Sequence, residues 1–184
     1  MAQRGPLPSV TEILDAVGLG MDLRVSAARR EYLFARGRAL HYAIQLDQAG
    51  ELDAATVHPE IAGKLDAWRK WAAAVQWQPQ HVEVELVHPT WAVVGHPDAI
   101  GLANGRLTLT DWKSSFDLHS VRLQLSAYAW LWQATHSDEP IDDYLALELQ
   151  AVGRYVPHPI DPRPYQQVFL AAVIVHRARL DRER

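Results

Sequence analysis

The sequence predicts an α/β fold in which a small mixed β-sheet of four to five strands is flanked by α-helices. Three observations favour this class. Residues 82–87 largely alternate apolar and polar side chains, the pattern of a half-buried strand. Residues 95–115 contain two apolar, β-branched runs on either side of Asn104-Gly105, a dipeptide typical of a tight hairpin turn. Around these strands, apolar residues recur at helical spacing in several segments.

The first part of the chain, residues 1–78, is predicted to be helical. A short helix is expected after a cap at Ser9 or Thr11, a longer one over residues 26–48, and a third over residues 58–76. In the third helix, Trp71 is expected to be half exposed.

The second part, residues 79–184, is predicted to form the sheet core with its flanking helices. Asp117 or Ser120 can cap the helix that follows the hairpin. The remaining elements are expected in the order helix 115–136, strand 143–152, strand 153–160 and helix 162–184. Together the two parts predict a single domain over residues 1–184, a length that suits one substantial core.

Composition excludes several classes of protein. The chain has no cysteine, which rules out a disulfide framework and a Cys-ligated zinc or iron-sulfur site. No apolar run is long enough to cross a bilayer, and the first residues lack the apolar core of a signal peptide. We therefore expect a cytoplasmic protein without a membrane partner.

The formal net charge of −4 does not indicate nucleic-acid binding, but the distribution of charge does. Residues 24–38 carry five arginines and one acidic residue, Glu31. Such a basic segment can hold a phosphate backbone, although a solvated helix face would have the same composition. The arginines are Arg24, Arg29, Arg30, Arg36 and Arg38.

The hairpin also carries charged residues. Asp98 lies on the incoming strand, and Asp111 and Lys113 lie two residues apart on the outgoing strand. Because strand side chains alternate between faces, Asp111 and Lys113 point the same way and Trp112 points the other way. Two carboxylates and an ammonium then share one patch, which is costly to desolvate unless a divalent cation binds between the carboxylates.

Four short motifs resemble those of the PD-(D/E)XK nuclease superfamily, with the closest likeness to RecB-like and phage-type exonucleases. The likeness covers roughly residues 37–132 and implies a restriction-endonuclease-like core. Because the chain has no cysteine, the cluster-bearing branch of these nucleases is excluded. The motifs are Gly37 to His41, Gly95 to Asp98, Asp111-Trp112-Lys113 and Gln124 to Tyr128.

The resemblance implies a catalytic site that holds Mg2+ or Mn2+. Asp98 and Asp111 would be the principal ligands, and the His41 imidazole and the Trp112 backbone carbonyl would complete the shell. Lys113 would orient the attacking water and offset negative charge in the transition state. Without the resemblance, His41 would be an ordinary helix histidine with a polar neighbour.

A glutamate from the preceding strand often joins this site in the family. Glu83 matches the family's spacing to Asp98 better than Glu85 does. Either glutamate could join the site, and one or both could instead face solvent. Gln124 and Tyr128, four residues apart on one helix face, would hold a phosphate, a water or the nucleotide, where otherwise they are a routine polar pair.

Three arginines of the basic segment and a serine next to Lys113 are also expected to bind DNA. These residues are Arg30, Arg36, Arg38 and Ser114.

The expected function is divalent-metal-dependent hydrolysis of DNA phosphodiesters, as an exonuclease in phage or bacterial recombination or repair. The alternative is a catalytically inactive protein with the nuclease fold that serves as a DNA-binding subunit or as an assembly subunit. A hydrolase of small phosphoesters is less favoured because no Gly-rich phosphate loop is present. A homo-oligomer, a recombination or helicase partner, the strand preference and the polarity of cleavage are left open.

Overall fold

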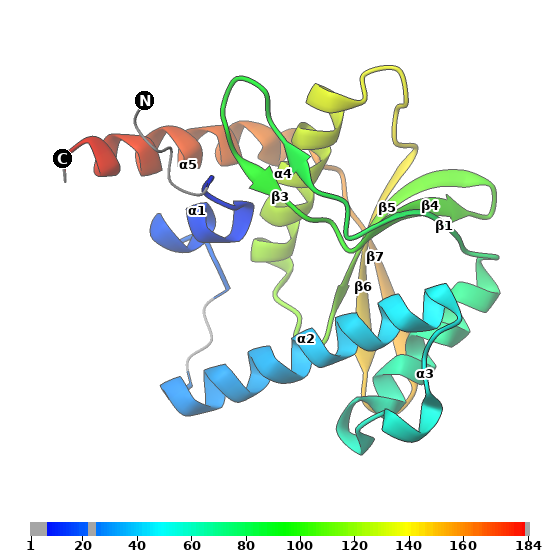
Figure 1. Cartoon of the computed structure of the whole chain (residues 1–184). Helices are drawn as coiled ribbons and strands as arrows, with labels where there is room; N and C mark the ends of the chain where they lie inside the picture. Colours follow the sequence, from blue (N-terminus) through cyan, green and yellow to red (C-terminus); the bar gives the residue numbers. More distant parts are fainter. Residues whose placement is uncertain (1–6, 22–24, 183–184) are drawn as a thin grey trace.

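The computed structural model describes residues 7–21 and 25–182, and its central feature is a five-stranded sheet between two layers of helices (Figure 1). The strand order is β1-β4-β5-β6-β7. β5 and β6 pair in parallel and the other neighbours are antiparallel, so the sheet is mixed, as predicted. The strands are β1 (Gln78–Val82), β4 (Ala99–Ala103), β5 (Arg106–Lys113), β6 (Asp143–Gln150) and β7 (Arg154–Pro159).

The helices begin and end within a few residues of their predicted positions. Ser9 caps the first helix in a reciprocal capping box with Glu12, and Asp117 caps the fourth by accepting from two backbone N–H groups. No helix among residues 7–21 and 25–182 has the length and hydrophobicity needed to span a membrane. The helices are α1 (Val10–Ala16), α2 (Ala27–Ala49), a short 3-10 turn η1 (Ala54–Thr56), α3 (Pro59–Ala74), α4 (Leu118–Thr135) and α5 (Arg163–Arg182). Arg24 of the basic run and residues 183–184 of the predicted last helix lie outside the described residues.

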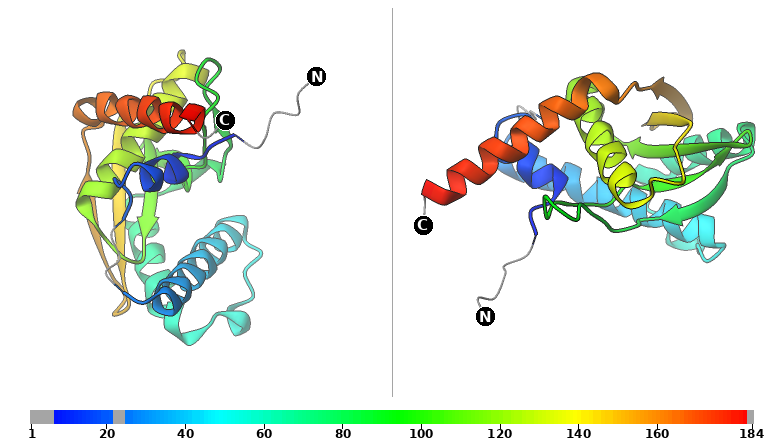
Figure 2. Two further views of the ribbon diagram at one scale, coloured as in Figure 1. Left: turned by 90° about the vertical axis from the view of Figure 1, so that its left-hand side faces the viewer. Right: turned by 90° about the horizontal axis from the view of Figure 1, so that it is seen from above.

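Each face of the sheet has its own hydrophobic core. α1, α4 and α5 pack on one face, and α2 and α3 pack on the other (Figure 2). The second core contains a cluster of tryptophans in which Trp71 lies between Trp77 and Trp112, with ring centroids 5.1 Å and 6.4 Å away. The prediction that Trp71 is half exposed is wrong, because this cluster leaves it only 1% exposed.

The predicted strand over residues 82–87 is interrupted, which corrects the sequence interpretation. β1 starts earlier, at the sheet edge where Pro79 is tolerated, and ends at Val82. Glu83 then adopts a left-handed φ of 51°, and its N–H donates to the carbonyl of Asp98 at 3.1 Å. The chain leaves the sheet there, and the two-residue strands β2 (Leu86–Val87) and β3 (Val94–Gly95) form a separate small sheet. The break places Glu83 beside Asp98.

The hairpin between β4 and β5 is confirmed. Asn104 and Gly105 both have positive φ angles, 51° and 78°, as a tight primed turn requires. The register pairs Ala99 with Thr110, so the residues before β4 lie beside the last residues of β5. This pairing brings Asp98 and Asp111 to the same end of the sheet.

We expect alanine to have opposite effects at two glycines inside helices. A Cβ at Gly63 in α3 would lie 1.9 Å from the carbonyl oxygen of Ala151, whereas a Cβ at Gly37 in α2 would meet Ser114 Oγ at an ordinary 3.6 Å. Gly63→Ala should therefore lower the free energy of unfolding by about 1–3 kcal/mol. Gly37→Ala should raise it by up to about 1 kcal/mol, because alanine has the higher helix propensity.

Urea unfolding followed by circular dichroism measures both effects. Two shifts of the same sign would contradict the packing of α3 against the turn between β6 and β7.

Candidate functional site

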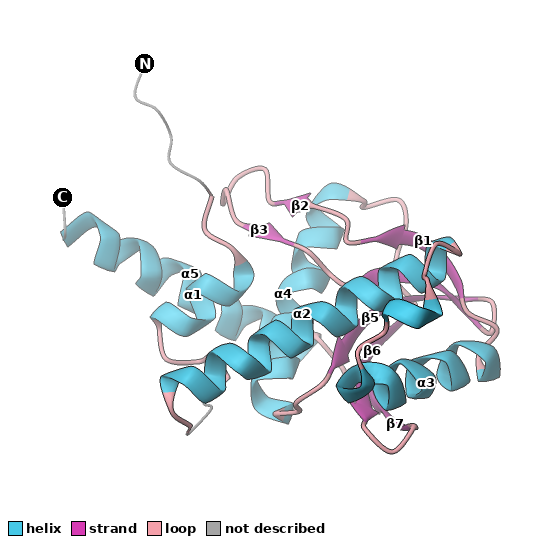
Figure 3. Ribbon diagram, turned by 60° about the horizontal axis from the view of Figure 1, so that its bottom comes forward, coloured by secondary structure: helices cyan, strands magenta, loops and turns pink. Residues whose placement is uncertain are grey.

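A cleft of about 1080 Å³ opens where β5 ends, between α1, α2 and α4. Figure 3 shows α2 passing in front of β5 and β6. Most of the residues that the sequence singled out line this cleft, although they come from separate segments of the chain. They are Arg30, Arg38, His41, Glu83, Asp98, Asp111, Lys113, Ser114 and Gln124.

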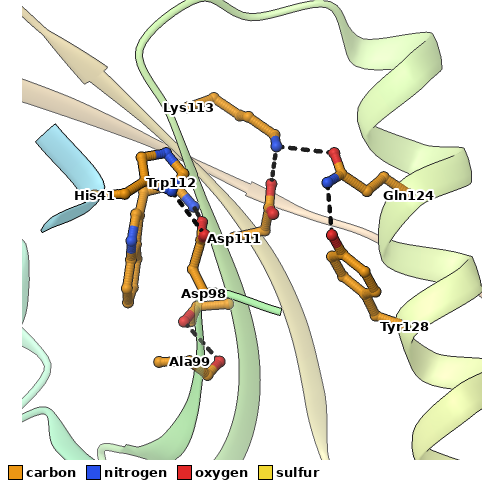
Figure 4. A network of polar contacts seen from close by, with 9 residues as sticks. His41, Asp98, Ala99, Asp111, Trp112, Lys113, Gln124 and Tyr128 are labelled. Atoms are coloured by element: carbon orange, nitrogen blue, oxygen red, sulfur yellow. Dashed lines mark hydrogen bonds and ion pairs between the residues drawn. The ribbon is translucent and has the colours of Figure 1, made fainter. Parts of the chain in front are cut away.

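Asp98 links three elements of the site (Figure 4). Asp98 directly precedes β4 and is only 5% exposed. One carboxylate oxygen accepts the backbone N–H of Trp112 in β5 at 2.6 Å. The other lies 2.8 Å from Nδ1 of His41 in α2. The carboxylate is therefore fixed in position by both a strand and a helix.

Asp111 and Lys113 lie on the same face of β5, as the strand alternation predicts. Lys113 Nζ forms an ion pair with Asp111 Oδ2 at 2.6 Å and donates to Gln124 Oε1 at 2.8 Å. Gln124 Nε2 in turn donates to the hydroxyl of Tyr128 at 2.8 Å, all in one row (Figure 4). The Trp112 side chain points to the opposite face, where it packs edge-on against Trp68.

Tyr128 lies behind Gln124 and not on the cleft wall. It is 4% exposed and does not line the cleft. A side chain on Gly95 would come within 3.1 Å of the Tyr128 ring, so the motif glycine gives this ring its space. Direct contact of Tyr128 with a substrate is therefore not supported by its position, and its contacts fit the positioning of Gln124.

Three groups could hold a cation together. One ligand atom from each of His41, Glu83 and Asp98 can be chosen so that all lie within 4.8 Å of one another. Carboxylate oxygens are the ligands that suit Mg2+ and Mn2+, and the imidazole of His41 would be a further ligand beside them. Glu85 points elsewhere, since it pairs with His96 at 3.4 Å and is exposed. The geometry thus favours Glu83 over Glu85, and these donors fit a divalent cation.

The electrostatics of the cleft are those of crowded carboxylates. Burial and the neighbouring Asp98 charge raise the pKa of Glu83 to about 7. Burial also raises the pKa of Asp111, against the opposing attraction of Lys113. Burial alone would lower the pKa of His41, but its pKa is raised because the Asp98 carboxylate favours the imidazolium. A bound cation would relieve this repulsion.

Besides Tyr128, one further predicted DNA contact, Arg36, does not line the cleft. Arg36 lies on another face of α2, with its guanidinium 5.7 Å from the centre of the Tyr32 ring. Its role in DNA binding stays a prediction.

Sequence reasoning missed Lys64, a buried lysine that binds the backbone next to Lys113. Its ammonium donates to the backbone carbonyl of Ser114 at 2.6 Å, and the residue is 5% exposed. The sequence does contain a signal, because Lys64 lies on the apolar face of its helix, between Ile61 and Trp68. A lysine at such a position needs a buried acceptor.

Known proteins resemble this chain in fold and in family. No curated protein sequence is significantly similar to the chain. Among solved structures, the alkaline exonuclease LHK-Exo of Laribacter hongkongensis in complex with dAMP is 14% identical, with a TM-score of 0.52 over 97% of this chain and 89% of that one. A candidate exonuclease of Eubacterium rectale is 11% identical, with a TM-score of 0.51 over 96% and 80%. At these identities the likeness establishes the fold, which is restriction-endonuclease-like.

The family is established by sequence. A family model described as the PD-(D/E)XK nuclease superfamily matches residues 22–179, most of the chain. The match spans the segments that carry His41, Asp98, Asp111 and Lys113. The chain therefore belongs to the PD-(D/E)XK nuclease superfamily.

Proposed function

We propose that this protein is a divalent-metal-dependent nuclease that hydrolyses phosphodiester bonds in DNA and removes nucleotides from an end. The observation that carries the proposal is the convergence of Asp98, Asp111 and Lys113 in one cleft with His41 and Glu83. Superfamily membership supports the reaction class, and two solved relatives described as exonucleases support the mode of attack. Recombination or repair in a phage or bacterium is the proposed setting.

The carboxylate end of the cleft would hold the cation. His41, Glu83 and Asp98 supply clustered ligand atoms, and Asp111 lies close enough for its charge to raise the pKa of Glu83. Mg2+ or Mn2+ bound there would act as a Lewis acid toward the phosphoryl group. The two hydrogen-bonding contacts of Asp98 restrict its rotation, so ligand geometry would be preorganised.

Lys113 would act on the phosphate directly. Burial opposes its charge, but the neighbouring Asp111 carboxylate raises the pKa of Lys113, so the amine stays protonated at neutral pH. A fixed ammonium at this point would stabilise the negative charge that develops on the phosphoryl oxygens. Gln124 keeps the ammonium in place, and Tyr128 keeps Gln124 in place.

We expect the affinity for Mn2+ to rise at least about tenfold between pH 6 and pH 8. Glu83, with its pKa of about 7, and His41, with its raised pKa, both hold a proton at pH 6 and must release it to bind a metal. Isothermal titration with MnCl2 in the absence of DNA measures this change.

Glu83→Gln should bind Mn2+ more weakly and with less dependence on pH, because one of the two titrating groups is gone. Glu85→Gln is the matched control and should behave as the wild type, since Glu85 is exposed and points to His96. Equal affinity of the wild type at both pH values would contradict the assignment of Glu83.

Lys113→Ala should lower turnover on DNA by roughly 10²–10³, the loss typical of a removed oxyanion-stabilising donor. Its affinity for Mn2+ should be at least as high as that of the wild type, because a competing positive charge next to Asp111 is removed. Lys70→Ala, at an exposed lysine paired with Asp66, is the control and should keep full turnover. Cleavage by a folded Lys113→Ala protein at the wild-type rate would refute the role of Lys113.

The proposed reaction is tested most directly with the wild type and Asp111→Asn on linear and circular DNA, single- and double-stranded, with Mg2+, Mn2+ or EDTA. We expect metal-dependent loss of linear DNA, intact circles, and no activity in the variant. Cleavage of circular DNA, which has no ends, would show that the protein is an endonuclease and not an exonuclease. Absence of cleavage with both metals would overturn the proposed function in favour of a DNA-binding or assembly subunit.

A further inference from the structure

The N-terminal half of α2 is an unusual helical segment. Over residues 27–39 no residue is buried, and the first buried residue of α2 is Leu40. Short helices are stable in proteins mainly because one face packs against the rest of the fold. In Figures 1 and 3 this segment extends beyond α3. Its residues Arg30, Phe34 and Arg38 line the cleft.

Four side chains of this helix form a single row that faces the cleft. Arg30, Phe34, Arg38 and Tyr42 follow one another at intervals of four residues, so they lie on one side of the helix. All four line the cleft. Positive charge and aromatic ring therefore alternate along one wall, with about 6 Å of helix rise between successive members.

The two rings of this row are exposed. Phe34 is 48% exposed and Tyr42 is 62% exposed. Within the described part of the chain neither ring makes a stacking, cation-π or hydrogen-bonding contact. Tyr32 on the same helix differs, since its hydroxyl contacts Glu60 and its ring lies beside Arg29. Exposure of apolar ring surface to water is unfavourable, and a ligand that covered the two rings would remove this surface from water.

The row leads to the proposed catalytic site. Tyr42 is adjacent in sequence to His41, and Phe34 lies about 12 Å from Tyr42 along the helix axis. A positively charged groove with aromatic side chains is how proteins bind single-stranded nucleic acid, because bases stack on the rings while arginines follow the phosphates. Bases in a duplex are already stacked on each other and offer no free face to these rings.

We propose that Arg30, Phe34, Arg38 and Tyr42 form a track that binds a single DNA strand and guides its end into the cleft, so that the enzyme acts on single-stranded ends. This inference rests on the proposed nuclease function and specifies its substrate. Phe34 and Tyr42 stack on bases. Arg38, which lies between the two rings, and Arg30, which lies beyond Phe34, contact the phosphates.

The test measures binding of a fluorescein-labelled 12-nucleotide oligo(dT) and of a 12-base-pair duplex, in EDTA, so that no cleavage occurs. Phe34→Ala/Tyr42→Ala should weaken oligo(dT) binding about 100-fold and change duplex binding less than threefold, because stacking contributes a factor of about ten or more per ring. Phe34→Trp should bind oligo(dT) as well as the wild type. Tyr32→Ala removes an aromatic ring from the same helix away from the cleft and should leave oligo(dT) affinity unchanged.

Salt dependence tests the arginine contact separately. Arg38→Gln should reduce the slope of the logarithm of affinity against the logarithm of salt concentration by about 0.7, the value for one phosphate contact on a single strand. Melting temperatures equal to that of the wild type show that each variant is folded, as expected for exposed positions.

Two results would overturn the track. One is oligo(dT) binding by the double variant within threefold of the wild type, and the other is an equal loss of oligo(dT) and duplex binding. Both differ from a failure of the proposed function, which appears as a wild-type protein that binds oligo(dT) in EDTA but cleaves no DNA with Mg2+ or Mn2+.

Discussion

The site depends on the position of one buried carboxylate. Asp98 accepts the N–H of Trp112 and contacts His41, so it joins the start of β4, the end of β5 and the middle of α2. Hydrogen bonds to a charged group contribute about 1.5–3 kcal/mol each, and removing one partner leaves the other unsatisfied. The carbonyl of the same residue also accepts from Glu83. Four segments of the chain therefore meet at Asp98.

The charged groups around Asp98 are crowded, which has a cost in stability. Asp111 is 1% exposed and has Lys113 as its ion-pair partner, while burial and the neighbouring Asp98 charge raise the pKa of Glu83 to about 7. Such crowding would be removed in a fold selected for stability alone. Two separate hydrophobic cores, one on each side of the sheet, stabilise the fold that carries these charges.

α2 connects these features. Its C-terminal half is held by Leu40, Ala43 and Ile44 in the core shared with α3, and this packing fixes His41 beside Asp98. Its N-terminal half lies along the cleft without such packing. One continuous helix thus carries both a proposed metal ligand and the proposed DNA track, which sets their spacing rigidly.

The sequence by itself determined the fold class, most element boundaries and the main candidate residues of the site, because these depend on local rules. Hydrophobic periodicity fixed the helices, the Asn104-Gly105 turn fixed the hairpin register, and strand alternation fixed Asp111 and Lys113 on one face. Only the tertiary structure favours Glu83 over Glu85 as a candidate ligand, because Glu83, a left-handed residue directly after β1, lies beside Asp98. The tertiary structure likewise decided that Trp71 is buried, that Lys64 donates to the carbonyl of Ser114 and that Tyr128 does not line the cleft. Each of these depends on contacts between segments that are distant in sequence, which local patterns do not encode.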